Sequence, residues 1–156
     1  MSVFKVIPIP DSVARGIRDK RVDDLGHELS VSIATEEDSG PCRSCLTVFR
    51  PGEARLLFSY APNPYDHPYN EIGPVYIHEQ ECRPYLDHKE FPRELRTRRP
   101  LVLRCYGDGG LMVGGELVGD RPVEEVIETL FSDAAVKYLH ARTATVGCYI
   151  ARIERA

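Results

Sequence analysis

Two pairs of residues in this sequence have the types and spacing of metal ligands. Cys42 and Cys45 form a C-x2-C pair, and His78 and Cys82 form an H-x3-C pair further along the chain. Thiolate sulfur and imidazole nitrogen are ligands that Zn²⁺ prefers, and a structural zinc ion usually takes four of them in a tetrahedron. The sequence therefore predicts a structural zinc ion held by Cys42, Cys45, His78 and Cys82.

The same residues allow other interpretations. A C-x2-C pair can be a redox dithiol, but that motif normally precedes a long helix, whereas Leu46 and the residues after it read as a strand. A thiol enzyme is a second alternative, in which Cys42 or Cys82 attacks a substrate and His78 acts as the base. In a third, the cluster is purely structural and binds no ion. A zinc knuckle also typically has glycine after its second cysteine, where this chain has Leu46.

A segment rich in proline and tyrosine, residues 61–73, is the second candidate site. Prolines leave few free amides for a strand, so the segment is predicted to be an ordered surface loop. Rigid aromatic rings beside charged groups can form a recognition surface for a small molecule or a protein, although the rings can equally pack on one another. Because the loop lies between the two ligand pairs, a bound zinc ion would hold it in place. The candidate binding residues are Tyr60, Tyr65, His67, Tyr69 and Glu71.

Outside these two sites the sequence predicts packing rather than chemistry. Cys105 follows the alternation of apolar residues in one predicted strand, and Cys148 does so in another, so both are expected in the core. His140 is interpreted as an exposed or hydrogen-bonded core residue, with a place in a pocket beside Tyr60 as the alternative.

Composition limits the class of protein. The chain has 156 residues, of which 42% are hydrophobic, enough for a core that needs no metal or disulfide. Its net charge of −4 argues against nucleic acid as a partner. The sequence shows neither a membrane-spanning segment nor a signal peptide, and its 5 cysteines are an odd number, so we expect reduced thiols in the cytoplasm. Only 4 of its 20 cationic residues are lysine, a skew that suggests a GC-rich bacterial genome.

The hydrophobic pattern predicts an α+β fold in one globular domain, residues 1–156, with an antiparallel or mixed sheet and two or three helices. Helices are expected at 13–21, capped by Asp11 or Ser12, and at 122–132, capped by Asp120. A turn at 50–53 is expected to join strands at 46–48 and 55–60 into a hairpin. The other predicted strands are 4–9, 29–33, 75–78, 101–105, 111–118, 136–141 and 147–153.

Several of these motifs also resemble a known family. The stretches Pro41–Leu46 and Gly73–His78, together with Cys82, are the most specific parts of a likeness that covers nearly the whole chain. The family it resembles is the bacterial domain of unknown function number 1203. That resemblance implies a stand-alone bacterial domain with no established activity, substrate or cofactor. It also implies that the four predicted metal ligands are a family motif.

Overall fold

The computed structural model describes residues 3–63, 65–87, 89–98 and 100–156; Pro64 of the predicted loop lies outside them. These residues form two α-helices and eight strands in two antiparallel sheets, which confirms the predicted α+β class. The helices are α1 (Asp11–Lys20) and α2 (Val123–Phe131), and short 3₁₀ turns lie at Arg93–Leu95 and Asp108–Gly110. The strands are β1 (Phe4–Ile7), β2 (Val31–Ile33), β3 (Ala54–Tyr60), β4 (Gly73–His78), β5 (Leu101–Tyr106), β6 (Met112–Leu117), β7 (Tyr138–Thr143) and β8 (Tyr149–Arg155).

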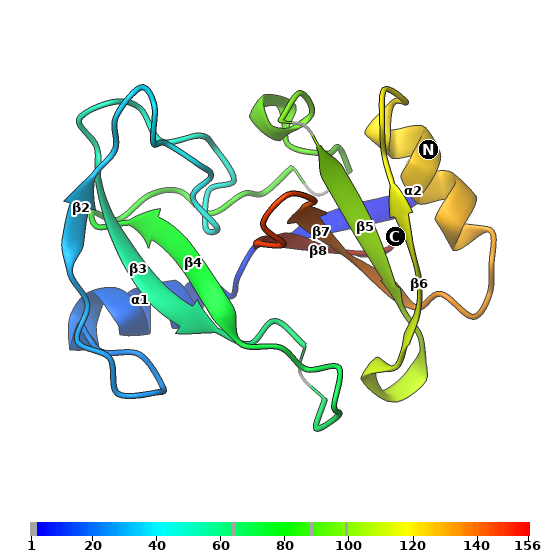
Figure 1. Cartoon of the computed structure of the whole chain (residues 1–156), viewed down its shortest axis with the longest axis horizontal. Coiled ribbons are helices and arrows are strands. Elements are labelled where there is room, and N and C mark those ends of the chain that lie inside the picture. Colours follow the sequence, from blue (N-terminus) through cyan, green and yellow to red (C-terminus); the bar gives the residue numbers. More distant parts are fainter. Residues whose placement is uncertain (1–2, 64, 88, 99) are drawn as a thin grey trace.

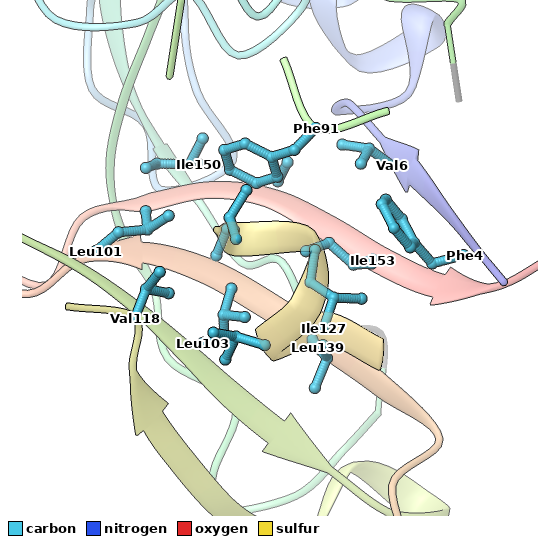
Figure 2. Close-up of a cluster of buried hydrophobic side chains, with 14 of the residues drawn as sticks. Phe4, Val6, Phe91, Leu101, Leu103, Val118, Ile127, Leu139, Ile150 and Ile153 are labelled. Atoms are coloured by element: carbon cyan, nitrogen blue, oxygen red, sulfur yellow. The ribbon is translucent and has the colours of Figure 1, made fainter. Parts of the chain in front are cut away.

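The larger sheet has the strand order β1-β8-β7-β5-β6 and lies with α2 on the right of Figure 1. Alternate residues of its strands are apolar and pack against one face of α2. Figure 2 shows Leu103 and Leu139 of the sheet gathered with Ile127 of α2. The predicted helix at 122–132 and the predicted strands at 101–105 and 111–118 are therefore confirmed, and the two strands pair as an antiparallel hairpin.

The smaller sheet has the order β2-β3-β4 and lies with α1 on the left of Figure 1. Ala14 and Ile17 of α1 are buried in a second hydrophobic cluster with residues of β3 and β4. Strands β3 and β4 form a hairpin in which Arg55 is opposite His78 and Tyr60 is opposite Gly73. The two ends of this hairpin carry the two candidate sites.

The predicted strand at 46–48 is wrong, and so is the hairpin that it was expected to form. Leu46 has a left-handed backbone with φ of 56°, and its amide donates to the carbonyl of Cys42 at 2.9 Å. The chain therefore forms a turn at the place where the alternation of apolar residues predicted an extended strand. Leu46 is buried because this turn points it into the core, and β3 pairs with β2 and β4 instead.

The predicted strand at 29–33 is observed over Val31–Ile33, but its apolar residues Val31 and Ile33 are 47% and 55% exposed. They lie on β2, the edge strand of its sheet. The predicted helix caps are also not observed. Prolines at positions 10 and 122 occupy the N-cap positions without a side-chain cap, so Asp11, Ser12 and Asp120 do not cap.

The two cysteines outside the predicted metal cluster differ in their burial. Cys105 is only 2% exposed, which confirms its predicted packing role. Cys148 is only partly buried, contrary to the core position expected for it. It lies in the turn between β7 and β8, where its amide donates to Oγ1 of Thr143, and the neighbouring Val146 is 74% exposed. Within the described residues, we find no helix with the length and apolarity to cross a membrane.

Asp23 anchors the connection between α1 and β2 to the smaller sheet. Its buried carboxylate accepts hydrogen bonds from the amides of Leu25, His27 and Ser59 at 2.9–3.0 Å. Burial alone would raise the pKa of Asp23, but these hydrogen bonds hold that pKa far below its usual value. The Asp23 carboxylate therefore stabilises the fold at every pH at which it is ionised.

We expect Asp23→Asn to lower the thermal midpoint at pH 7, because the amide cannot accept all of these bonds. A depressed pKa in the folded state means that the stabilisation is present above the ordinary value of 3.8 and is lost as the pH falls through the folded pKa. The gap between wild type and variant should therefore narrow from pH 7 to pH 3. Thermal melts at both pH values test this, with the exposed Asp24→Asn as the control.

Candidate metal centre

The fold brings the four predicted ligands together. One ligand atom from each of Cys42, Cys45, His78 and Cys82 lies within 4.8 Å of the others. The sulfurs of Cys42 and Cys82 are 3.9 Å apart, and the sulfur of Cys45 is 3.6 Å from Nδ1 of His78. A tetrahedral zinc site with bonds of about 2.3 Å to sulfur and 2.0–2.1 Å to nitrogen has edges of about 3.8 and 3.6 Å. The donor set and its spacing therefore fit zinc.

A tight turn presents the first two cysteines. The amide of Cys42 donates to the carbonyl of Thr47 at 2.9 Å, and Leu46 closes the turn in its left-handed conformation. This is the position where a zinc knuckle usually has glycine, and the turn keeps the same backbone shape with a leucine. The amide of Arg43 donates to the carbonyl of Tyr76 at 3.0 Å, which ties the turn to β4.

Strand β4 directs His78 to the cluster. Val75 and Ile77 point into the core, so His78 lies on the opposite face with its ring 4.6 Å from that of Phe49. Its Nδ1 faces the sulfurs, and its Nε2 lies 2.8 Å from a carboxylate oxygen of Glu53. A carboxylate on the far nitrogen of a metal-ligating histidine fixes the tautomer and the ring orientation.

Helix α1 supplies a cation to the cluster. Arg18 donates from Nε to the carbonyl of His78 at 3.0 Å and from Nη2 to the sulfur of Cys82 at 3.3 Å. Zn²⁺ with three thiolates and a neutral imidazole carries a net charge of −1, which this guanidinium offsets. Neither Arg18 nor Glu53 was predicted from the sequence. Arg18 is 64 residues from Cys82 and Glu53 is 25 residues from His78, so no local spacing signals these contacts.

The four ligands cannot all be in their metal-binding protonation state without a cation between them. Hydrogen bonds with Cys45 and Cys82, together with burial, raise the pKa of Cys42, whereas hydrogen bonds from Cys42 and Cys45 lower the pKa of Cys82. Hydrogen bonds to the sulfurs of Cys45 and Cys82 raise the pKa of His78 to about 10. These shifts favour a protonated Cys42, a Cys82 thiolate and a protonated His78 in the metal-free protein, so metal binding must displace the protons of Cys42 and His78.

The centre lies at the surface rather than in the deep core. Cys42 is fully buried, while Cys45, His78 and Cys82 are partly exposed and line a hollow of about 550 Å³. With four protein donors, a tetrahedral ion would have no open position for substrate, which is the arrangement of a structural site.

The structure does not place the Pro/Tyr-rich loop next to these ligands. The loop follows Tyr60 and ends at Gly73, at the opposite end of the β3–β4 hairpin from His78. Five strand steps separate Gly73 from His78, a distance of about 16 Å. The adjacency inferred from the sequence is therefore wrong, because an intervening loop in the sequence can leave from the far end of a hairpin.

The predicted binding residues are divided between two places. Tyr60 and Glu71 line a cavity between the two sheets. Tyr65 and Tyr69 are 42% and 43% exposed, and the ring of His67 stacks on that of Tyr69 at 5.4 Å. The rings of the loop thus partly pack on one another, and a binding role for these five residues stays a prediction.

Fold and site together define an α+β protein with a Cys₃His group that could hold a metal ion. The chain belongs to the family described as "Protein of unknown function (DUF1203)", which matches residues 39–155. That range contains all four candidate ligands. Searches of curated proteins and of solved structures found no significant match.

Proposed function

We propose that this protein binds one structural zinc ion through Cys42, Cys45, His78 and Cys82. The observation that carries the proposal is the convergence of four soft donors within 4.8 Å, from a turn, a strand and an irregular segment. The carboxylate of Glu53 on His78 and the guanidinium of Arg18 on Cys82 complete the surroundings that such a centre requires.

The proposed ion would join the segment that carries Cys82 to the turn and the strand that carry the other three ligands. Cys82 lies in an irregular segment after β4, whose described residues form no helix or strand before Arg93. Tyr85 connects this segment to the turn through one backbone hydrogen bond to the carbonyl of Ser44 at 3.0 Å. A metal bond to Cys82 would order the segment against β4 and the 42–47 turn.

A thiol-dependent enzyme is the second candidate. It is favoured by the hollow beside Cys45, His78 and Cys82 and by the hydrogen bond from Arg18 to the sulfur of Cys82. A guanidinium beside a partly exposed sulfur stabilises a thiolate, which is the nucleophilic form of cysteine. In this proposal no metal is bound, and His78 acts as the base or orienting group for redox or acyl chemistry.

Alkylation by iodoacetamide at pH 7 distinguishes the two functions. For the zinc centre we expect Cys42, Cys45 and Cys82 to stay largely unmodified until a chelator is added, because their sulfurs are bound to metal. The thiol enzyme requires Cys82 to react without chelator, and faster than the partly buried Cys148, because an activated thiolate is the nucleophilic form of cysteine. Peptide mass spectrometry of the time course identifies the modified residue.

We also propose that the protein binds a small molecule or another protein in the cytoplasm rather than nucleic acid or a membrane. The net charge of −4 supports this, because a site that neutralises many phosphates needs an excess of cations.

A further inference from the structure

One face of the five-stranded sheet is polar although it lies inside the protein. Arg104 of β5 is opposite His140 of β7, and His140 is opposite Arg152 of β8. Because side chains alternate along a strand, Tyr138 and Arg142 share this face with His140. The other face of the same strands carries the hydrophobic core of α2. The polar face therefore lies on the side of the sheet away from that core.

Several nitrogens of this face lack partners although they are buried. Within the described residues, no hydrogen-bond partner exists for either ring nitrogen of His140, Nε of Arg142 or Nη1 of Arg152. His140 is 0% exposed and Arg142 is 6% exposed. Buried polar groups in folded proteins are nearly always paired, so orphan donors at one place indicate a missing acceptor.

The charges of this region are also unbalanced. Arg104 and Arg142 lie 2.9 and 3.7 Å from one carboxylate oxygen of Glu71, and Arg152 pairs with Glu154 at 2.6 Å. Arg43, 4% exposed, adds a fourth cation whose donors go to the carbonyls of Tyr149 and Pro41. Among the described residues of this region, four guanidinium groups are thus accompanied by two carboxylates.

The titration of His140 agrees with this excess of positive charge. Burial lowers the pKa of His140 to about 3, and the charges of Arg142, Arg152 and Arg104 act in the same direction. The imidazole is therefore neutral at physiological pH and adds no charge of its own. Excess buried positive charge is costly unless an anion compensates it.

A cavity opens beside Arg142. It has a volume of about 190 Å³ and is lined by Arg142, the rings of Tyr60 and Tyr149, and Glu71 from the Pro/Tyr-rich loop. Arg142 is fixed there by a hydrogen bond from Nη1 to the carbonyl of Gly147 at 2.8 Å. Glu71 is 52% exposed on its side chain, and its carboxylate bridges two arginines in the position that a ligand anion would take.

We infer that this cavity binds a small oxyanion, a carboxylate or a phosphate group, through Arg142 with Arg104 beside it. Glu71 competes as a tethered carboxylate that the ligand displaces from the arginines. Guanidinium groups pair with both kinds of oxyanion in a bidentate geometry, and the tyrosine rings give an apolar surface for a carboxylate attached to a flat group. The site is separate from the metal centre, which lies at the other end of β4.

Titration calorimetry of the full chain at low salt tests this site with inorganic phosphate, benzoate and the neutral benzamide. We expect phosphate or benzoate to bind with a dissociation constant of about 0.1–1 mM, and benzamide to bind at least about tenfold more weakly than benzoate. The comparison of phosphate with benzoate identifies which oxyanion the cavity prefers. Arg142→Gln should weaken the binding of the preferred oxyanion by about tenfold or more.

Glu71→Gln provides a test that does not depend on the folding of an arginine variant. Removing the competing carboxylate should tighten oxyanion binding by about two- to fivefold. Glu116→Gln is the matched control, because Glu116 is also a partly exposed partner of an arginine, Arg121, at 2.9 Å. The inference is overturned if neither anion binds wild type or Glu71→Gln below about 10 mM, if benzamide binds as well as benzoate, or if Glu116→Gln tightens binding as much as Glu71→Gln.

Discussion

Removal of the proposed zinc ion with EDTA is expected to lower the thermal midpoint of the protein by about 10 °C. When the free concentration of an ion is about 100–1,000 times its dissociation constant, binding stabilises the folded chain by about 3–4 kcal/mol. For a chain of this length each kcal/mol shifts the midpoint by about 2–4 °C. Because 156 residues can form a core without a metal, the metal-free protein should remain folded at 25 °C but unfold at a lower temperature.

Thermal melts with and without EDTA measure this shift, and circular dichroism at 25 °C checks that the chelated chain keeps its sheets. Adding one equivalent of Zn²⁺ after the chelator has been removed should restore the original midpoint. An unchanged midpoint in EDTA would contradict the structural role. An equal fall of the midpoint in EDTA, in a variant that has already lost a metal ligand, would contradict it as well.

Replacing one ligand should abolish metal binding, whereas replacing a cysteine outside the cluster should not. For Cys45→Ser we expect the metal content to fall from about one equivalent to below about 0.1, because three donors leave the tetrahedron incomplete. Cys148→Ser is the matched control, since Cys148 is equally a partly buried free thiol but lies in the β7–β8 turn. Cys45 is preferable to the fully buried Cys42, whose substitution also disturbs packing.

The two predictions are linked, because EDTA and the ligand substitution remove the same interaction. EDTA should lower the midpoint of wild type and of Cys148→Ser by the same amount and leave that of Cys45→Ser unchanged, which is the non-additivity of two changes at one site. The assignment of ligands is refuted if Cys45→Ser retains metal or if Cys148→Ser loses it.

The sequence was sufficient to locate the cluster. Two closely spaced ligand pairs predicted which four side chains converge, and the hydrophobic pattern predicted the strand that ends at His78. The structure confirms both, together with α2 and the β5–β6 hairpin, because these depend on local patterns of spacing and polarity.

The sequence was not sufficient for features that depend on distant segments or on backbone conformation. Arg18 and Glu53 reach the cluster from α1 and from the turn before β3, and nothing in their own neighbourhoods marks them. Leu46 adopts a left-handed conformation that its side chain disfavours, so its apolar character suggested a strand.

The polar face of the larger sheet is marked in the sequence, but its burial is not. Tyr138, His140 and Arg142 alternate with the apolar Leu139 and Ala141, the pattern of a strand with one polar face. Such a face is normally exposed to solvent. The sheet register sets arginines of β5 and β8 on either side of His140, and the exposed fractions of His140 and Arg142, 0% and 6%, show that this face is buried.

The most direct test of the account is the metal content of the unmodified protein. Elemental analysis of chain purified without chelator should find about one equivalent of zinc, bound in a form that EDTA removes together with the stabilisation. Less than about a tenth of an equivalent of any transition metal, after reconstitution with Zn²⁺ has been attempted as well, would contradict the zinc centre.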